Sequence, residues 1–488
     1  MQLWIGAHLP SLCLEVFRPK WSHESADGVA ILERDKVVEL DAIARDAGVR
    51  RGMRRGGVLT LAPHAELRER DASREQDTLV ALATGLMQFS PQVVVAEENT
   101  VLVDVSASLR LFGGVRALLR ACRGVADAVG VTGTFGIAPT GQGAWLLAQN
   151  GGGRALSARS FARSLAPMPV TQLPPARRYG EWLSGIGCET VGQLQRLPRP
   201  GLNKRCGTAL LDLVDRAIGV SPEAHEWLQL PPTFTARIEM PDRIEHAEAC
   251  LFAARRVIVQ LVGWLVNQQL AVRKLVVMLE HERGRSAVDP TKIEIALGEP
   301  TWKEEHLVRL LKERLGRVEL VAPVIGLAID ASDVEDAAPL SAELFPEPGG
   351  SPADHNRLLE LLTARLGAEN VLRPAPAADH RPEIAARWVP LNDPAKWTAP
   401  PSDSPRSVWL LETPAKLLMR GHRPFYGTPL RMVSSGERVE AGWFDGDIVT
   451  RDYFVAESED AICYWIYRER VGSRDDDEAR WYLHGLFG

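Results

Sequence analysis

The sequence lacks the features that mark secreted, membrane-spanning and zinc-binding proteins. Its six cysteines are scattered, with no Cys-x-x-Cys pair and no histidine spacing typical of structural zinc. This usage favours reduced thiols in a cytoplasmic protein. No apolar run reaches the roughly 18 residues that a membrane-spanning helix needs, and the longest, 257–266, is interrupted by Gln260. The first residues lack a basic segment followed by an apolar one, so we expect no signal peptide and no membrane contact.

The sequence also lacks a strong net charge. A formal charge of −6 over 488 residues does not by itself indicate a nucleic-acid-binding protein. Two segments are locally basic, however. Residues 45–55 hold five arginines (45, 50, 51, 54 and 55) against one acid, and residues 177–216 hold seven basic residues against four acids. Charge alone is equally compatible with phosphate contact and with a solvated face.

The length of the chain predicts several domains, and the local patterns place them. Strand-like and helical stretches alternate at the start, around an insertion of helices and loops, which predicts a multidomain α/β (α+β) protein. A helical segment, a β-α-β-β-α-β module, an acidic linker rich in proline and glycine, and a tryptophan-containing C-terminal region follow. The expected boundaries are 1–17 with 71–165, then 18–70, 166–232, 233–331, 332–352 and 353–488.

The helical segment contains a Gly-Ile-Gly turn at Gly185 and Gly187, between two short helices. Such turns let backbone N–H groups approach a DNA phosphate, although the same glycine spacing also occurs in plain loops. Lys204 and Arg205 follow and support the DNA interpretation. The next module balances 14 basic residues against 14 acids over 234–330, so any DNA contact there depends on a few arginines. Our candidates in that module are Arg273, Arg283 and Arg285.

The acidic linker contains one apolar pair, Leu344-Phe345, with no evident core to join. A short peptide that ends in two large apolar side chains suits docking into a pocket on a partner. The alternative is that the pair packs back on its own domain.

Taken together, these features resemble the Y-family translesion DNA polymerases, which consist of palm, inserted fingers, thumb and little finger. The resemblance covers about residues 1–330. Residues 3–15 resemble the family's first strand and helix, and 42–49 resemble its fingers motif, with Arg45 on the motif's arginine. Residues 102–106 and 134–138 resemble two further palm strands. The resemblance implies contact with primer-template DNA.

The residues that would hold metal in such a polymerase are missing. The chemistry needs carboxylates for two Mg²⁺ ions, and the positions that match the family's acids are Gly6, His8, Asn99 and Thr100. A shifted register could bring in one acid from the pair at residues 97 and 98, but a single carboxylate does not make a two-metal site. We therefore expect no metal, no cofactor and no polymerase activity.

One branch of the family, the ImuB proteins of bacterial SOS mutagenesis cassettes, is similar in these losses and in its extension. The stretch Ser341-Ala342-Glu343-Leu344-Phe345 resembles the family's β sliding-clamp motif, with serine in place of its usual glutamine. The resemblance implies a cytoplasmic, non-catalytic scaffold on the nucleoid that binds DNA and the β clamp. It further implies recruitment of an error-prone DnaE-type polymerase (ImuC) and of ImuA through the C-terminal region.

Two other interpretations remain open on the sequence. One is an active Y-family polymerase with an atypical metal site. The other is a DNA-binding module without clamp or polymerase partners.

Overall fold

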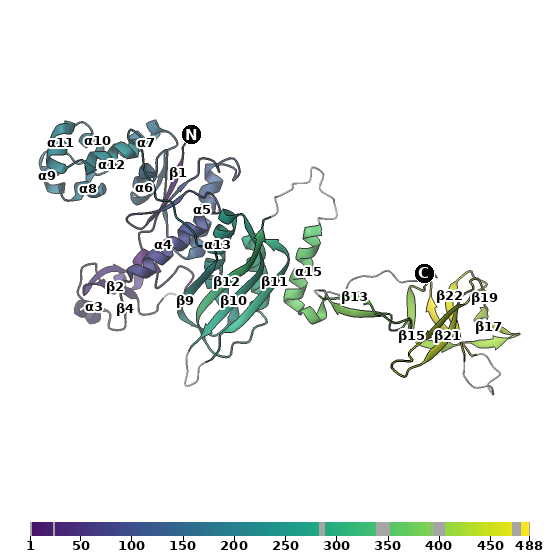
Figure 1. The fold of residues 1–488 in the computed structure, drawn as a ribbon. Coiled ribbons are helices and arrows are strands. Elements are labelled where there is room, and N and C mark those ends of the chain that lie inside the picture. Colours follow the sequence, from purple (N-terminus) through teal and green to yellow (C-terminus); the bar gives the residue numbers. More distant parts are fainter. Residues whose placement is uncertain are drawn as a thin grey trace. The chain divides into compact units, whose positions relative to one another are not determined.

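The computed structural model describes residues 2–22, 25–282, 288–337, 352–391, 393, 406–470 and 480–487. The chain divides into two compact units, Met1–Arg365 and Leu366–Gly488, which we treat separately. Both units contain β-sheets, and the first unit also contains many helices, so that it is a mixed α/β assembly (Figure 1). The predicted multidomain α/β class is confirmed.

The first unit begins with a five-stranded sheet in the order β5-β6-β1-β7-β8. Its central strand β1 (Trp4–His8) runs antiparallel to both neighbours, β6 (Thr100–Asp104) and β7 (Thr134–Ala138). Side chains alternate between the two faces of a strand. Ile5 and Ala7 therefore join the core beneath two long helices, whereas Trp4 and Gly6 face a shorter one. The remaining elements are α1 (Leu12–Glu15), α4 (Ala72–Leu86), β5 (Val93–Ala96), α5 (Val115–Val129), α6 (Gly141–Gln149) and β8 (Gly153–Arg154).

The insertion at 18–70 contains a three-stranded sheet in the order β3-β2-β4 beside its helices and loops. The β-like runs at 29–32 and 36–40 form β2 and β3, whereas β4 is four residues long and offers little alternation to detect. Two short helices complete a small separate core. The elements are β2 (Val29–Glu33), β3 (Lys36–Leu40), α2 (Ala42–Asp46), α3 (Arg55–Leu61) and β4 (Glu66–Glu69).

A helical segment follows and packs on the face of the first sheet that carries α6. The Gly-Ile-Gly turn joins α9 to α10, as predicted. The sequence pattern at 207–218 is helical and corresponds to α12, and a further helix, α11, ends just before Gly207. The elements are α7 (Ala158–Leu165), η1 (Val170–Gln172), α8 (Pro174–Arg177), α9 (Gly180–Gly185), α10 (Val191–Leu194), α11 (Arg199–Cys206) and α12 (Ala209–Ile218).

The β-α-β-β-α-β module is confirmed, with strand order β11-β10-β12-β9. Its last strand runs to Asp336, so the prediction that a linker begins at residue 332 is wrong by five residues. The added residues pair with the start of β10, a contact that a local pattern does not show. The elements are β9 (Thr235–Ile244), η2 (Ala247–Ala249), α13 (Cys250–Gln268), β10 (Leu270–His281), β11 (Thr291–Thr301), α14 (Glu304–Leu315) and β12 (Val324–Asp336).

Helix α13 ties this module to the first sheet. With the turn before it, α13 is long and apolar enough to cross a membrane by length and composition, but it is mostly buried in the module's core. It crosses α4 at a point where two glycines leave no room for a side chain. A Cβ on Gly263 would overlap the carbonyl oxygen of Thr84, and one on Gly85 would lie 2.9 Å from Val259. Nearby, the buried Arg256 donates to the hydroxyl of Thr78 at 3.0 Å.

Helix α15 (Pro352–Leu366) corrects a second boundary. We predicted it in the C-terminal region, but all except its last residue belongs to the first unit. Glu360 accepts hydrogen bonds from the backbone N–H of Gly298 and of Glu299, and its other oxygen lies 2.6 Å from Nε2 of His306. Ala364 completes the contact by joining the apolar core of the module.

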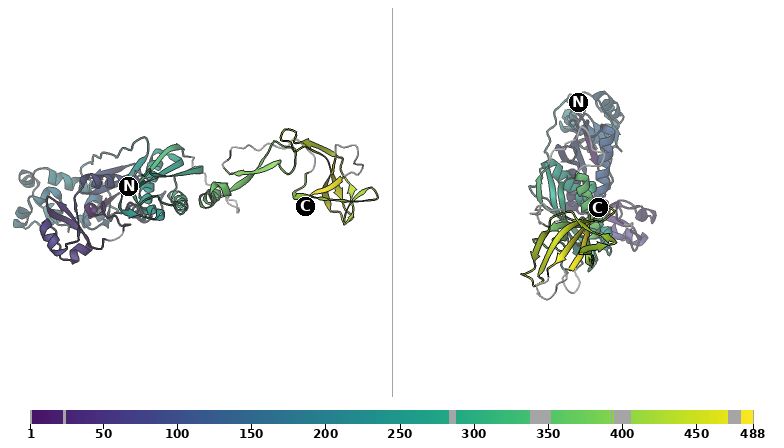
Figure 2. Two further views of the ribbon diagram at one scale, coloured as in Figure 1. Left: turned by 90° about the horizontal axis from the view of Figure 1, so that it is seen from below. Right: turned by 90° about the vertical axis from the view of Figure 1, so that its right-hand side faces the viewer.

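The second unit is built almost entirely from strands. Its main sheet has the order β15-β23-β22-β21-β19, with β20 paired to β21, and the long strands lie side by side in the right-hand view of Figure 2. The proline-containing stretch 372–390 holds two paired strands, because proline does not prevent a short ladder. The elements are η3 (Ala368–Asn370), β13 (Leu372–Pro376), β14 (Ala386–Pro390), β15 (Trp409–Lys416), β16 (Leu418–Arg420), β17 (Arg423–Tyr426), β18 (Thr428–Pro429), β19 (Arg431–Met432), β20 (Glu437–Ala441), β21 (Val449–Glu457), β22 (Cys463–Glu469) and β23 (Arg480–Leu486).

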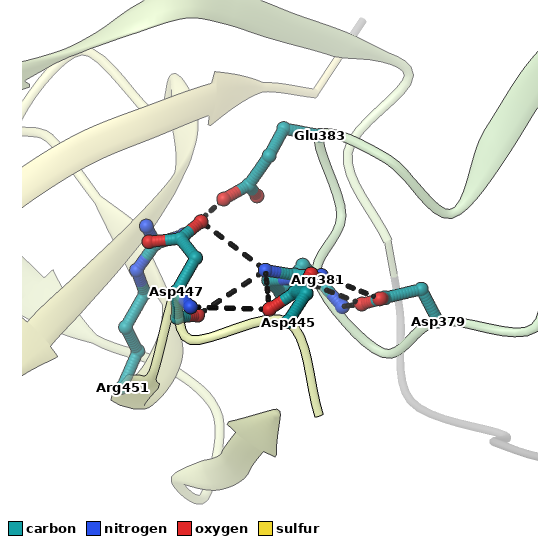
Figure 3. A network of polar contacts seen from close by, with 6 residues as sticks. All are labelled: Asp379, Arg381, Glu383, Asp445, Asp447 and Arg451. Carbon is teal, nitrogen blue, oxygen red and sulfur yellow. Dashed lines mark hydrogen bonds and ion pairs between the residues drawn. The ribbon is translucent and has the colours of Figure 1, made fainter. Parts of the chain in front are cut away.

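A buried arginine organises one end of the second unit (Figure 3). The side chain of Arg381 is 3% exposed and pairs with Asp379, Asp445 and Asp447. Three carboxylates around one guanidinium join the β13–β14 connection to the loop before β21. The planar guanidinium carries several N–H donors, so it can bind carboxylates from several directions and hold the two segments together.

Candidate functional site

The candidate site lies on the face of the first sheet that carries Gly6 and His8. Both residues are on β1 and point to the same side, because they are two positions apart. Gly6 is opposite Leu102 on β6, and His8 is opposite Thr100. The structure therefore brings all four predicted positions close together: Gly6 and His8 lie on β1, Thr100 begins the adjacent strand β6, and Asn99 lies in the turn between β5 and β6.

Helix α6 occupies the space that a side chain at position 6 would need. A Cβ on Gly6 would lie 2.7 Å from the carbonyl oxygen of Ala144 and 2.9 Å from its carbonyl carbon. Gly136, the partner of Gly6 on β7, is covered in the same way by the backbone of α6. An aspartate at position 6 does not fit unless this helix moves.

His8 is held by the turn between β5 and β6. Its Nδ1 lies 2.9 Å from the carbonyl oxygen of Glu98 and 3.2 Å from the hydroxyl of Thr100. Since a carbonyl only accepts, Nδ1 carries the proton in the first contact. Burial lowers the pKa of His8, which favours the neutral ring. The imidazole is thus used to fix a turn.

The turn itself has an unusual backbone. Glu98 and Asn99 both have φ of +53°, the left-handed region that side chains seldom adopt. The carbonyl oxygen of Asn99 accepts a hydrogen bond from the N–H of Leu9 at 2.9 Å, and Thr100 is fully buried. Asn99 and Thr100 therefore stabilise the pairing of β1 with β6.

The two acids that a shifted register could bring in are engaged differently. Both carboxylate oxygens of Glu98 accept hydrogen bonds from Arg177 of α8, at 2.5 and 3.0 Å. This pairing raises the pKa of Arg177, and the guanidinium charge compensates the carboxylate charge of Glu98. Glu97 has an exposed side chain, and its carbonyl oxygen accepts a hydrogen bond from the indole N–H of Trp145 at 3.0 Å.

The segment after α12 braces helix α6 from its other end. Glu223 accepts hydrogen bonds from the backbone N–H groups of Gly141 and Gln142, at 2.8 and 2.7 Å. A carboxylate at this helix N-terminus complements the helix dipole. Beside it, the ring of His225 packs on Trp4 with centroids 4.5 Å apart. Nothing in the sequence pattern pointed to Glu223, because it lies 82 residues from Gly141.

The donor set does not fit a two-Mg²⁺ site. Among the described residues, no three histidine, cysteine or acidic side chains gather in a way that could hold a metal ion. Asp104 accepts a hydrogen bond from the backbone N–H of Ser106, and the buried Glu15 accepts one from Thr132 at 2.9 Å. Both carboxylates thus serve local structure, and we derive no metal-dependent step.

The candidate DNA-binding residues of the two basic segments are mostly accessible. Arg45 is exposed on α2 and forms no ion pair within the described part of the chain, whereas Arg51 pairs with Glu39 and Arg55 with Glu69. Only part of the predicted arginine patch is therefore available to a phosphate.

The Gly-Ile-Gly turn is open to solvent. Gly187 has φ of +74°, and a Cβ on Gly185 or Gly187 would meet no atom within 4 Å. The backbone of this turn can therefore be approached closely. Lys204 and Arg205 are exposed on α11, and the guanidinium of Arg205 lies 5.5 Å from the ring centre of Trp182 beside the turn.

The β-α-β-β-α-β module offers fewer cations than its composition suggested. Arg273 pairs with Glu335 on the neighbouring strand at 3.0 Å. Arg237 pairs with Glu280 in the same manner. The candidates Arg283 and Arg285, and the stretch from Ser341 to Phe345, lie outside the described residues.

Comparison with known proteins identifies relatives of the chain. Residues 20–149 match the model of the impB/mucB/samB family. The chain is 26% identical over 462 residues to "Protein ImuB" from two strains of Caulobacter vibrioides, which covers 90% of this chain and 99% of each relative. Among solved structures, a ternary complex and a post-insertion binary complex of the DNA polymerase Dbh match at 16% and 15% identity. They cover 68% and 70% of this chain and 99% and 100% of theirs, each with a TM-score of 0.38.

Proposed function

We propose that this chain, a homologue of ImuB with an impB/mucB/samB family region, is a non-catalytic scaffold in DNA-damage-induced translesion synthesis. The observation that carries the proposal is the position of α6. Its backbone fills the space above Gly6, where the polymerases of this family carry a metal-binding aspartate. His8, Asn99 and Thr100 are used to hold the β5–β6 turn, and none is a carboxylate.

The scaffold binds primer-template DNA through the helical segment. In this assignment 1–17 with 71–165 form a palm-like domain, 18–70 the fingers, 166–232 the thumb and 233–336 the little finger. The open turn at Gly185 and Gly187, with Lys204 and Arg205 beside it, supports phosphate contacts that position a duplex without reading its sequence. The ion-paired Arg273 is a weaker candidate.

The scaffold also binds the β sliding clamp and other proteins. Leu344-Phe345 docks into the clamp, and the second unit recruits the DnaE-type polymerase ImuC and ImuA. The motif spacing and the similarity to ImuB along 90% of the chain support these assignments.

Primer extension with the purified protein tests the absence of catalysis. We expect no template-dependent synthesis with Mg²⁺ or Mn²⁺, while fluorescence anisotropy on the same primer-template shows binding. The alternative, an active polymerase with an atypical metal site, predicts synthesis that Glu97→Ala/Glu98→Ala abolishes. That outcome would overturn the proposal.

A second experiment tests the DNA surface. The Lys204→Ala/Arg205→Ala variant should weaken binding to primer-template and reduce the salt dependence by about 0.9 per lost phosphate contact. Arg309→Ala/Lys312→Ala on α14 removes the same charge from exposed positions and should leave both quantities unchanged. Equal weakening by the two variants would show a general effect of charge and would contradict this surface.

A further inference from the structure

One stretch of the second unit carries positive charge without any acid. From Thr413 to Gly436 the sequence contains one lysine, three arginines and one histidine, and no aspartate or glutamate. In a chain of net charge −6, this asymmetry is local. The stretch includes the small sheet β16-β17-β18, and Figure 1 shows β17 at the rim of the unit.

The tip of this sheet is a tight hairpin. Strands β16 and β17 pair from Leu418 opposite Phe425 to Arg420 opposite Arg423. The two residues between the arginines, Gly421 and His422, have φ of +54° and +62°. Positive φ at both central positions is the geometry of a type I′ turn, which matches the twist of paired strands. The hairpin therefore presents its two arginines side by side.

This arrangement is unfavourable in isolation. Like charges directly opposite each other on paired strands destabilise a sheet. Places where a sequence breaks such a local rule are expected at functional sites. The guanidinium of Arg420 stacks over Phe425, 4.2 Å from the ring centre, which holds one cation in place without neutralising it.

The other arginines of the same unit are treated differently. Those of the main sheet and its loops pair with carboxylates: Arg381, Arg406, Arg431, Arg438, Arg451, Arg468 and Arg470. Within the described residues, Lys416, Arg420 and Arg423 form no ion pair. Most arginines in the described part of the unit are thus ion-paired, whereas the hairpin keeps its cations unpaired.

Apolar surface accompanies these charges. Tyr426 is 47% exposed and Leu418 is 63% exposed, on the last residue of β17 and the first of β16. Leu417 and Leu430, by contrast, are buried in the core of the unit and anchor the base of the hairpin. The ring of Tyr426 packs edge-on against Tyr464, which fixes its orientation.

We infer that the β16–β17 hairpin binds single-stranded nucleic acid. Phosphates contact Arg420 and Arg423, and a base stacks on Tyr426. Cations along a backbone path together with an aromatic platform are the combination by which proteins bind single strands without sequence preference. This inference does not rest on the proposed function, since neither the helical segment nor the clamp motif takes part.

The test uses the full chain and a fluorescein-labelled oligothymidylate, with anisotropy measured over a series of salt concentrations. In a Lys204→Ala/Arg205→Ala background, Arg420→Ala/Arg423→Ala should weaken binding and flatten the salt slope by about 1.4, or 0.7 for each lost contact. Tyr426→Ala should weaken binding by roughly fivefold or more, which corresponds to the loss of one stacked base. The matched control, Arg406→Ala/Arg431→Ala, removes the same charge from ion-paired positions and should leave the slope unchanged.

A second readout places the strand on the hairpin. An oligonucleotide with 5-iodouracil should crosslink to Phe425 or Tyr426, as identified by peptide mapping. Wild-type binding by Arg420→Ala/Arg423→Ala, or crosslinks confined to the first unit, would overturn the inference while leaving the scaffold proposal standing. It would equally be overturned if these variants bound DNA normally but lost an acidic protein partner.

Discussion

The carbonyl oxygen of Ala144 lies 2.7 Å from the point where a side chain on Gly6 would begin. Helix and strand meet here backbone to backbone, so the first strand is closed to any larger residue. The close approach of α6 is possible because residue 6 is a glycine, and it leaves no room for an aspartate there.

Restoring the acid should therefore damage the protein without producing a polymerase. We expect Gly6→Asp to lower the free energy of unfolding by at least about 1–3 kcal/mol, the usual effect of overpacking. Thermal denaturation measures this loss, and primer extension should remain negative. Gly124→Asp is the matched control, because a Cβ on Gly124 would meet no atom within 4 Å. Unchanged stability of Gly6→Asp would contradict this account of the site.

Two glycine-to-alanine substitutions, one at the crossing of α4 and α13 and one on the exposed side of α5, should have opposite effects on stability. Gly263→Ala places a methyl group against the carbonyl oxygen of Thr84 and should cost about 1–3 kcal/mol of stability. Gly124→Ala, in the exposed part of α5, should instead stabilise by about 0.5–1 kcal/mol, as alanine does in a helix interior. Urea denaturation compares the two variants, and a stabilising Gly263→Ala would show that the helices do not meet as described.

The attachment of α15 should depend on pH. Burial of Glu360 opposes its ionisation, but hydrogen bonds from His306 and from the Gly298 and Glu299 backbone outweigh burial and lower its pKa. A carboxyl group with a lowered pKa stabilises the folded state above its ordinary pKa, about 4.3. That contribution is lost as the pH falls below this value.

Amide hydrogen exchange of α15 at a series of acidic pH values measures this attachment. Protection should fall selectively in α15 as the pH drops below about 4.3. Glu360→Gln should remove most of that dependence and leave α15 less protected at neutral pH. Glu305→Gln, at an exposed position of α14, should behave as wild type. The same pH profile in wild type and Glu360→Gln would assign the effect to another group.

The proposed clamp motif predicts that one variant loses binding to the β clamp and that another binds it more tightly. Leu344→Ala/Phe345→Ala should abolish co-elution with the β clamp and leave DNA binding unchanged, because two large apolar side chains contribute on the order of 3–6 kcal/mol before ordering costs. Ser341→Gln, which restores the usual first residue of the motif, should strengthen co-elution. Equal retention of wild type and the double variant would refute clamp docking at this position.

Much of the fold could be predicted from local patterns. The β-α-β-β-α-β module and the Gly-Ile-Gly turn between α9 and α10 agree with the structure, because hydrophobic periodicity and glycine placement are local signals. The short strands β4, β13 and β14 were missed, since four or five residues with charges or prolines give little periodicity.

The candidate site was less accessible to sequence analysis. The sequence shows that positions 6, 8, 99 and 100 carry no acid, but it does not show that α6 closes the space above position 6. Contacts such as Arg177 with Glu98 and Glu223 with Gly141 join residues about 80 positions apart, and a single sequence does not reveal them. Arg273 was chosen as a free cation, yet its partner Glu335 lies on the adjacent strand, 62 residues away.

The paired glycines Gly85 and Gly263 also restrict how this protein can be recombined with its relatives. Gly263 of α13 lies against the backbone of Thr84 and Gly85 on α4, and neither glycine has room for a side chain. A chimera that takes α4 from one parent and α13 from another therefore creates a clash wherever either parent carries a larger residue at this crossing. A crossover that preserves the fit transfers both helices or neither.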